Sequence, residues 1–214
     1  MDKSKKHRRQ KKVATVHEND LIATGGSRTR QAESEPIVVH NKHELQQLFA
    51  VSSDHVCGLM LRLLYGSGLR LNEIVELKVS DLDMESMRLR VGTNGKRTHT
   101  TVLPDSVKYD ILREMSNKRP EDYIFSLRNA PDGTAIPISK RTLQNYLQRK
   151  SAEINIRFTA QSLRDSFIVH MLLRGIDSSL LKRILGYRNE RSLMRYIHHI
   201  TGKPIELESP LKDL

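Results

Sequence analysis

The stretch GSGLRLNEIVELKVSDLD, residues 66–83, decides the fold of this chain. It overlaps the apolar run HVCGLMLRLLYGSG (55–68), which predicts a helix that ends at Gly66 or Gly68, since glycine readily adopts the left-handed backbone that ends many helices. The apolar spacing in LNEIVELKV predicts a second, short helix directly afterwards. Arg70 therefore lies at the junction of two predicted helices.

The other segments predict a mainly α fold with a small antiparallel β-hairpin, an α+β class. MRLRV (87–91) and THTTVLP (98–104) predict two strands joined by the turn GTNGK. Asn41 and Glu44 form a capping-box pattern at the start of a first helix. YIFSL is a short apolar piece followed by the polar turn NAPDG, and from Ser139 the chain is predicted to be helical almost throughout.

The charge of the chain favours a polyanionic partner, most often nucleic acid, although a well-solvated surface is the alternative. The net charge is +11 and the isoelectric point is about 9.9. The segment MDKSKKHRRQKK (1–12) contains seven Lys/Arg and one Asp. We expect residues 1–36 to be a basic, disordered arm that tracks phosphates or, equally, a solubilising tail.

Several classes of protein are disfavoured by the composition. Cys57 is the single cysteine, which excludes an internal disulfide framework and a Cys-rich metal site. No run of about 18 apolar residues exists, so we expect no membrane span, and the charged N-terminus is unlike a secretory signal. A cytoplasmic location fits best. The pair His198–His199, taken with His170, lacks a further ligand at metal-binding spacing, and DLD (81–83) is interpreted as a solvated turn, so we expect no metal.

Two arginines occupy unusual positions. Arg70, beside a glycine-loosened junction, can reach a phosphate with a bidentate fork, although most such arginines are surface or salt-bridging residues. Arg164 lies in the apolar segment LRDSFIVHML, where a buried guanidinium requires a partner. Gln161, three residues earlier, shares its helix face. This pair either lines a site or forms a satisfied structural network.

Taken together, these stretches resemble the catalytic domain of the tyrosine recombinase (phage integrase-like) family. The resemblance rests on GSGLRLNEIVELKVSDLD, LRDSFIVHMLLRG, LLKRILGY and RYIHHI, and it runs from about residue 37 to the end. Arg164, Tyr187 and Tyr196 keep the spacing of the family. The tail IELESPLKDL is also similar to the ends of integron integrases.

The resemblance implies an enzyme, a site-specific recombinase or integrase of a mobile element that cuts and rejoins double-stranded DNA through a 3′-phosphotyrosine. By resemblance, Arg70 and Arg164 neutralise charge on the phosphate and Tyr196 is the nucleophile. In the family, a lysine in the hairpin turn usually protonates the leaving oxygen, and the resemblance implies Lys96 for this role, since it is the only lysine in GTNGKRTH. The family needs no metal or cofactor, and its members assemble as a tetramer on two DNA sites.

The sequence departs from the family pattern at three positions. Gln161 stands where the family usually has His, and an amide cannot shuttle a proton. Tyr187 replaces the usual His or Trp and is a weaker acid–base group than His at neutral pH. Lys96 lies about two residues later than the usual lysine, which would fall near Asn94. An active recombinase with a substituted pocket and a catalytically impaired copy both remain open.

The expected domain organisation is a basic arm (1–36) followed by a tyrosine recombinase catalytic domain (37–214). Many family members carry a helical core-binding domain before the catalytic domain, and we expect it to be absent here. The competing class is a non-enzymatic, sequence-specific DNA-binding regulator whose helices after Ser139 form a helix-turn-helix-like unit.

Overall fold

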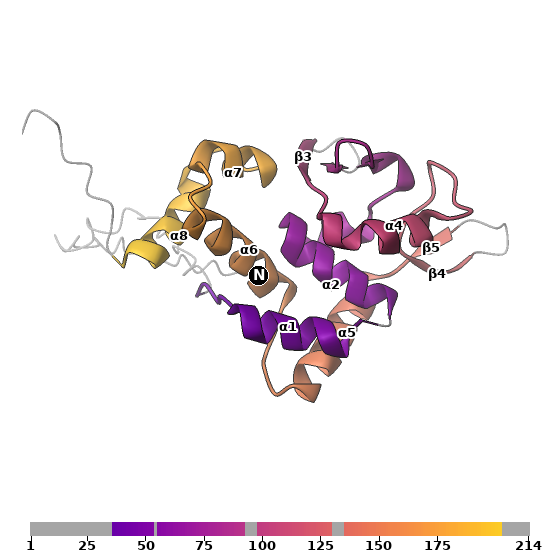
Figure 1. Ribbon diagram of the computed structural model, residues 1–214, viewed down its shortest axis with the longest axis horizontal. Coiled ribbons are helices and arrows are strands. Elements are labelled where there is room, and N and C mark those ends of the chain that lie inside the picture. The colour runs from indigo at the N-terminus through magenta and orange to yellow at the C-terminus, as the bar shows by residue number, and fades with distance from the viewer. Residues whose placement is uncertain (1–35, 54, 93–97, 130–134, 203–214) are drawn as a thin grey trace, which may run out of the picture. The chain divides into compact units, whose positions relative to one another are not determined.

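The computed structural model of the protein describes residues 36–53, 55–92, 98–129 and 135–202 (Figure 1). Of the basic arm predicted for residues 1–36, all but Pro36 lies outside the described residues. Lys96 and the C-terminal tail that resembles integron integrases lie outside them as well.

The described residues form a mainly α-helical fold with two small antiparallel sheets, which confirms the predicted α+β class. The helices are α1 (Lys42–Val51), α2 (Val56–Ser67), α3 (Leu71–Val75), α4 (Lys108–Met115), α5 (Lys140–Glu153), α6 (Ala160–Leu173), α7 (Ser178–Ile184) and α8 (Arg191–Thr201), with the 3-10 turns η1 (Val79–Asp81) and η2 (Asp105–Val107). The strands are β1 (Leu82–Asp83), β2 (Arg88–Val91), β3 (His99–Val102), β4 (Ser126–Asn129) and β5 (Ala135–Pro137). Within the described part of the chain, no helix is long and apolar enough to cross a membrane.

Local signals in the sequence set the helix ends. The Asn41 side chain accepts from the backbone N–H of Glu44, whose carboxylate accepts from the N–H of Asn41, so the predicted capping box is confirmed. Helix α2 ends at Gly68, which adopts the left-handed conformation with φ of 63°. This sharp end turns the chain at once into α3 and places Arg70 at the N-cap of that helix.

The predicted hairpin is confirmed and is extended by a third strand. Strands β2 and β3 pair antiparallel with Val91 opposite His99, and β1 adds to the other edge of β2. A second sheet, β4–β5, pairs the end of the short apolar piece with Ala135–Pro137, which follows the predicted polar turn, and the sequence did not predict it. Its formation depends on pairing between segments on either side of that turn, and a backbone hydrogen bond from Ile138 to Phe125 of 2.9 Å continues the pairing.

The hydrophobic core has two parts that meet between α2 and α6. The larger part surrounds α2 and includes residues from α1, α5 and the β-hairpin. The smaller part joins α6, α7 and α8 and contains Tyr196. Tyr65 packs against both parts, and Figure 1 shows α2 and α6 side by side.

The segment that precedes α1 is anchored to α6. The backbone N–H of His40 donates to Ser166 Oγ at 2.9 Å, and its imidazole Nε2 lies 2.9 Å from Ser162 Oγ. The same ring stacks on Phe158 with ring centres 3.8 Å apart. Because α6 also carries Arg164, these contacts help to fix the position of the buried guanidinium.

We expect Gly68→Ala to destabilise the fold more than Gly175→Ala. Both glycines have positive φ, and a Cβ at Gly68 would lie 2.4 Å from Phe167 Cδ1, whereas nothing lies within 4 Å of a Cβ at Gly175. The shared backbone penalty is about 1–2 kcal/mol, and the clash at Gly68 adds about 1–3 kcal/mol. Urea unfolding of both variants measures the difference; equal losses would contradict the proposed packing constraint.

Candidate active site

The first part of the candidate site is an arginine and a glutamate at the start of α3. The backbone N–H of Arg70 donates to Glu73 Oε2 at 2.6 Å, and its guanidinium donates to Glu73 Oε1 at 2.7 Å. The spacing of three residues at a helix start allows both bonds, because the carboxylate folds back onto the N-cap. The Arg70 side chain is 41% exposed, so its guanidinium is fixed at one edge and open at another.

The second arginine, Arg164, is buried in α6. Its guanidinium donates to the carbonyl oxygen of Gly68 and, at 3.1 Å, to that of Leu185. It also lies 3.8 Å from Glu73 Oε2. The predicted need for a partner is therefore confirmed, and the same carboxylate contacts both arginines.

Tyr187 lies beneath the two arginines. The guanidinium carbon of Arg70 is 5.5 Å from the centre of the Tyr187 ring, and that of Arg164 is 5.3 Å away. Both distances are within the range of a cation–π attraction. The structure thus brings together three of the residues selected from the sequence, which come from α3, α6 and the turn after α7.

Tyr196, on α8, is adjacent to this group but buried, with 2% of its surface exposed. Its hydroxyl donates to Asp165 Oδ1 at 2.7 Å, and it also forms a hydrogen bond with Tyr187. Burial above all, followed by Tyr187 and Asp165, raises the pKa of Tyr196 above its usual value. The phenol is consequently neutral at physiological pH.

The side chain of Gln161 forms a hydrogen bond with Asp165. Its amide Nε2 donates to Asp165 Oδ1 at 2.7 Å, one helical turn along α6. The sequence suggested that Gln161 and Arg164 share a face; in the structure the hydrogen bond of this amide goes to the buried carboxylate instead. Asp165 therefore receives donors from two residues of the candidate site, Gln161 and Tyr196.

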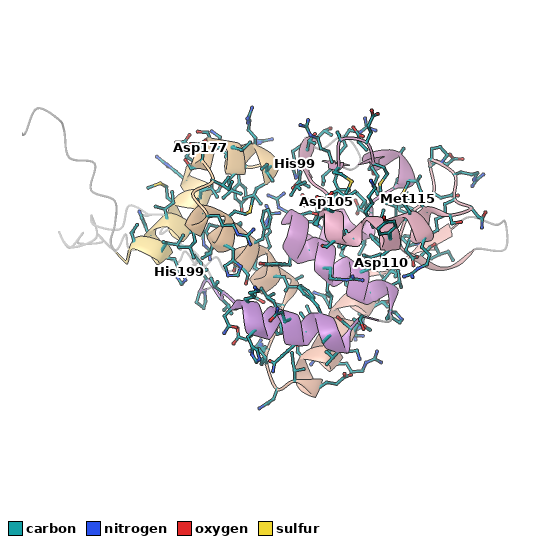
Figure 2. The ribbon with its side chains drawn as sticks, viewed as in Figure 1. His99, Asp105, Asp110, Met115, Asp177 and His199 are labelled. Carbon is teal, nitrogen blue, oxygen red and sulfur yellow. The ribbon has the colours of Figure 1, made fainter. Side chains whose placement is uncertain are left out.

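His99, on β3, lies next to the arginine pair and faces a cavity. The cavity has a volume of about 990 Å³ and lies between the β-hairpin and α7. Figure 2 shows His99 between β3 and α7. Burial lowers the pKa of His99 below its usual value, Arg70 and Arg164 lower it further, and Glu73 raises it in opposition.

The same cavity has a cationic lining. Arg88, Lys182, Arg183 and Arg188 contribute to its walls together with one carboxylate, that of Asp105. Lys182 is paired with Glu190 at 3.3 Å, whereas Arg88, Arg183 and Arg188 have exposed side chains. A surface of this kind is suited to an anionic ligand that has several charges in a row.

Sequence reasoning missed three residues of this site. Glu73 was detectable as the acidic residue three positions after a predicted N-cap, and Asp165 as a carboxylate within an apolar helix. His99 gave no signal in its strand, because only the tertiary structure places it beside Arg70. Lys96, the predicted acid of the hairpin, lies outside the described residues.

The chain belongs to the phage integrase family, because the model of that family matches residues 39–202. Two similar relatives are the proteins named tyrosine recombinase XerA from Pyrococcus horikoshii and Pyrococcus furiosus. The first is 28% identical over 150 residues, which are 68% of this chain and 51% of the relative. The second is 30% identical over 152 residues, which are 69% of this chain and 51% of the relative. The chain thus spans about half the length of the curated relatives it matches.

Solved structures support the same fold. A crystal structure of XerA recombinase aligns with a TM-score of 0.63 at 19% identity and covers 82% of this chain and 63% of that one. The catalytic domain of bacteriophage HP1 integrase aligns with a TM-score of 0.56 at 21% identity and covers 83% of this chain and 95% of that domain. The described residues therefore have the fold of a tyrosine recombinase catalytic domain.

We expect Tyr196→Phe to destabilise the protein by about 1–3 kcal/mol, because it removes a donor from the buried carboxylate of Asp165. Tyr109→Phe is the matched control, since Tyr109 is 85% exposed, and it should change stability by less than about 0.5 kcal/mol. Urea unfolding followed by circular dichroism provides the comparison. Equal stability of the two variants would show that the Tyr196–Asp165 hydrogen bond contributes nothing.

Proposed function

We propose that the protein is a site-specific DNA recombinase that cuts and rejoins double-stranded DNA through a 3′-phosphotyrosine. The observation that carries the proposal is that Arg70 and Arg164 both contact the carboxylate of Glu73. Both also contact the ring of Tyr187, and Tyr187 forms a hydrogen bond with Tyr196. Membership of the phage integrase family supports it.

The arginine pair is suited to bind a phosphodiester. Two guanidinium groups against one carboxylate leave a net positive charge where the exposed part of Arg70 meets solvent. Charge develops on the phosphate oxygens as a nucleophile attacks, and donors fixed in advance stabilise that charge without reorganising. Glu73 and the two backbone carbonyl groups supply this fixation.

In the proposed cleavage step, the oxygen of Tyr196 forms a bond to phosphorus while the bond from phosphorus to the 5′ oxygen breaks. The phenol proton passes to Asp165, which already accepts the hydrogen bond of that hydroxyl. The leaving 5′ oxygen takes up a proton, a role that the resemblance assigns to Lys96. Attack by a 5′-hydroxyl on the phosphotyrosine reverses the step and joins the strands.

Tyr196 has to become accessible before it reacts. Its side chain is buried between α6 and α8. We propose that DNA binding triggers a small outward shift of α8 that retains the hydrogen bond to Asp165. The shift admits the phosphate to the hydroxyl while its proton acceptor stays in place.

The proposed partner is double-stranded DNA, bound along the cationic cavity between the hairpin and α7. Among proteins of similar fold, XerH site-specific recombinase was solved bound to difH substrate, with 17% identity and a TM-score of 0.60. We further propose that four protomers assemble on two DNA sites, as the family resemblance implies.

A second candidate function is sequence-specific DNA binding without efficient cleavage. The burial of Tyr196 and the substituted positions Gln161 and Tyr187 favour it. Both candidates use the same cationic cavity. They differ in whether a covalent bond to DNA forms.

Covalent trapping distinguishes the two candidates. The full chain is incubated with a pool of duplexes of randomised sequence. Each duplex is nicked a few nucleotides to the 3′ side of a fixed phosphodiester, so that cleavage releases a short fragment with a free 5′-hydroxyl, which diffuses away. After denaturation, a recombinase leaves a protein–DNA adduct on the gel, and Tyr196→Phe abolishes it because no phenol oxygen remains. DNA binding without any adduct would establish the second candidate, and an adduct that survives Tyr196→Phe would show that another residue is the nucleophile.

We expect Arg70→Ala to slow adduct formation by a factor of about 10²–10³, the usual loss on removal of one donor to the transition state. DNA binding should be largely retained, because the cationic cavity is unchanged. Arg113→Ala is the control, since Arg113 is 74% exposed on α4 and pairs with Asp110 there. Adduct rates on captured duplexes and band-shift affinities measure both effects; a loss of affinity as large as the loss of rate would argue against a role in the transition state.

A further inference from the structure

The leaving 5′ oxygen of the proposed reaction requires a proton donor, and the described part of the site offers a residue for this task. We propose that His99 is the general acid that protonates this oxygen, an inference that rests on the proposed recombinase function. In the reverse step, the neutral imidazole takes the proton back from the attacking 5′-hydroxyl.

The backbone fixes His99 at the edge of the site. It begins β3, directly opposite Val91 of β2, and its ring packs against the turn that follows α7. A Cβ on Gly186 would lie 2.6 Å from His99 Nδ1, so the ring occupies the space that a side chain there would fill. Gly186 directly precedes Tyr187. The turn after α7 therefore positions both the imidazole of His99 and the Tyr187 ring that contacts the two arginines.

The imidazole of His99 is available to a ligand. Neither of its nitrogens has a hydrogen-bond partner among the residues that the structure describes. The residue also lines the cationic cavity, where DNA is proposed to bind. By contrast, His40 Nε2 forms a hydrogen bond with Ser162, and His170 Nδ1 forms one with Tyr65. Among the described residues, His99 therefore differs from these two histidines in lining the cationic cavity with no hydrogen bond to its ring.

The charges around His99 suit a group that gains a proton when DNA binds. Arg70, Arg164 and Glu73 act on it directly, while Tyr187 and Lys182 line the same cavity. Without DNA, burial and the two arginines lower the pKa of His99. An anionic phosphate placed against the arginines opposes their effect and raises that pKa, so the imidazole becomes protonated where the donor is needed.

Other groups in the described site are less suitable donors. Gln161 has an amide that does not exchange protons at neutral pH. Lys182 is engaged with Glu190 at 3.3 Å. The hydroxyl of Tyr187 is directed to Tyr196, on the side of the nucleophile. Lys96 precedes His99 by three positions in the same hairpin, and the experiment has to separate these two.

The proposed step is balanced. The Tyr196 oxygen bonds to phosphorus, the bond from phosphorus to the 5′ oxygen breaks, Asp165 receives the phenol proton, and the His99 imidazolium gives its proton to the 5′ oxygen. A general acid of this kind contributes a factor of about 10²–10⁴ to the rate. If the leaving atom is sulfur, a thiolate departs without protonation, and the contribution of the acid is lost.

The test compares duplexes that carry an ordinary phosphodiester with otherwise identical duplexes in which sulfur replaces the bridging 5′ oxygen. Both are prepared in sequences captured from the randomised pool by wild-type protein. His99→Asn should form the adduct about 10²–10⁴ times more slowly than wild type on the oxygen duplex, and at nearly the wild-type rate on the sulfur duplex. On the oxygen duplex, the wild-type rate should fall as pH rises through the pKa of His99, and the sulfur duplex should lack this fall.

Matched variants make each outcome decisive. His43→Ala, at an exposed position on α1, should match wild type on both duplexes. Equal slowing of His99→Asn on both duplexes would assign a structural role to His99, and no slowing on the oxygen duplex would remove any role. If sulfur rescues Lys96→Ala and not His99→Asn, the acid is Lys96. All three results overturn this inference and leave the recombinase proposal intact, whereas absence of any wild-type adduct overturns both.

Discussion

The rest of the site depends on the contacts of the Glu73 carboxylate with Arg70 and Arg164. This carboxylate closes the N-terminus of α3, forms an ion pair with Arg70 at 2.7 Å and lies 3.8 Å from the guanidinium of Arg164. Two cations placed close together repel each other, and a buried guanidinium is strongly unfavourable without a counter-charge. One acidic residue therefore allows two arginines from distant parts of the chain to occupy the same small volume.

The fold supplies the remaining constraints through backbone atoms. The carbonyl of Gly68 ends α2 and accepts from Arg164, while the carbonyl of Leu185 ends α7 and accepts from the same guanidinium. Because helix ends leave carbonyl groups without intrahelical partners, a buried arginine satisfies them and is satisfied in turn. The convergence of α2, α6 and α7 thus creates both the core contact and the arginine site, so that stability and the candidate chemistry depend on the same bonds.

The parts of the fold that were predictable from the sequence depend on local signals. The capping box at Asn41, the end of α2 at Gly68 and the pairing of β2 with β3 each depend on residues that lie close together in the sequence. The β4–β5 sheet was missed, since its strands are short and stabilise each other only once paired. The candidate site follows the same division. The spacing of Arg164, Tyr187 and Tyr196 was visible, but the Tyr196–Asp165 bond spans 31 positions and the place of His99 depends on tertiary packing.

The two arginines and Tyr196 differ in whether they must move before they can contact a ligand. This difference has an energetic consequence. The guanidinium groups are fixed before any ligand arrives, whereas the phenol is buried, neutral and bonded to Asp165. Exposing an aromatic ring of this size costs about 1.5–3 kcal/mol, so the ring would be exposed in roughly a tenth to a hundredth of the molecules, even with the Asp165 bond retained. Under the proposed function, the exposed part of Arg70 is open to a phosphate before Tyr196 is, because the Arg70 side chain is 41% exposed and Tyr196 is buried. If α8 shifts as proposed, a DNA segment that does not stabilise the shifted helix would be released uncut, and selectivity would then come from the coupling between α8 and the bound DNA.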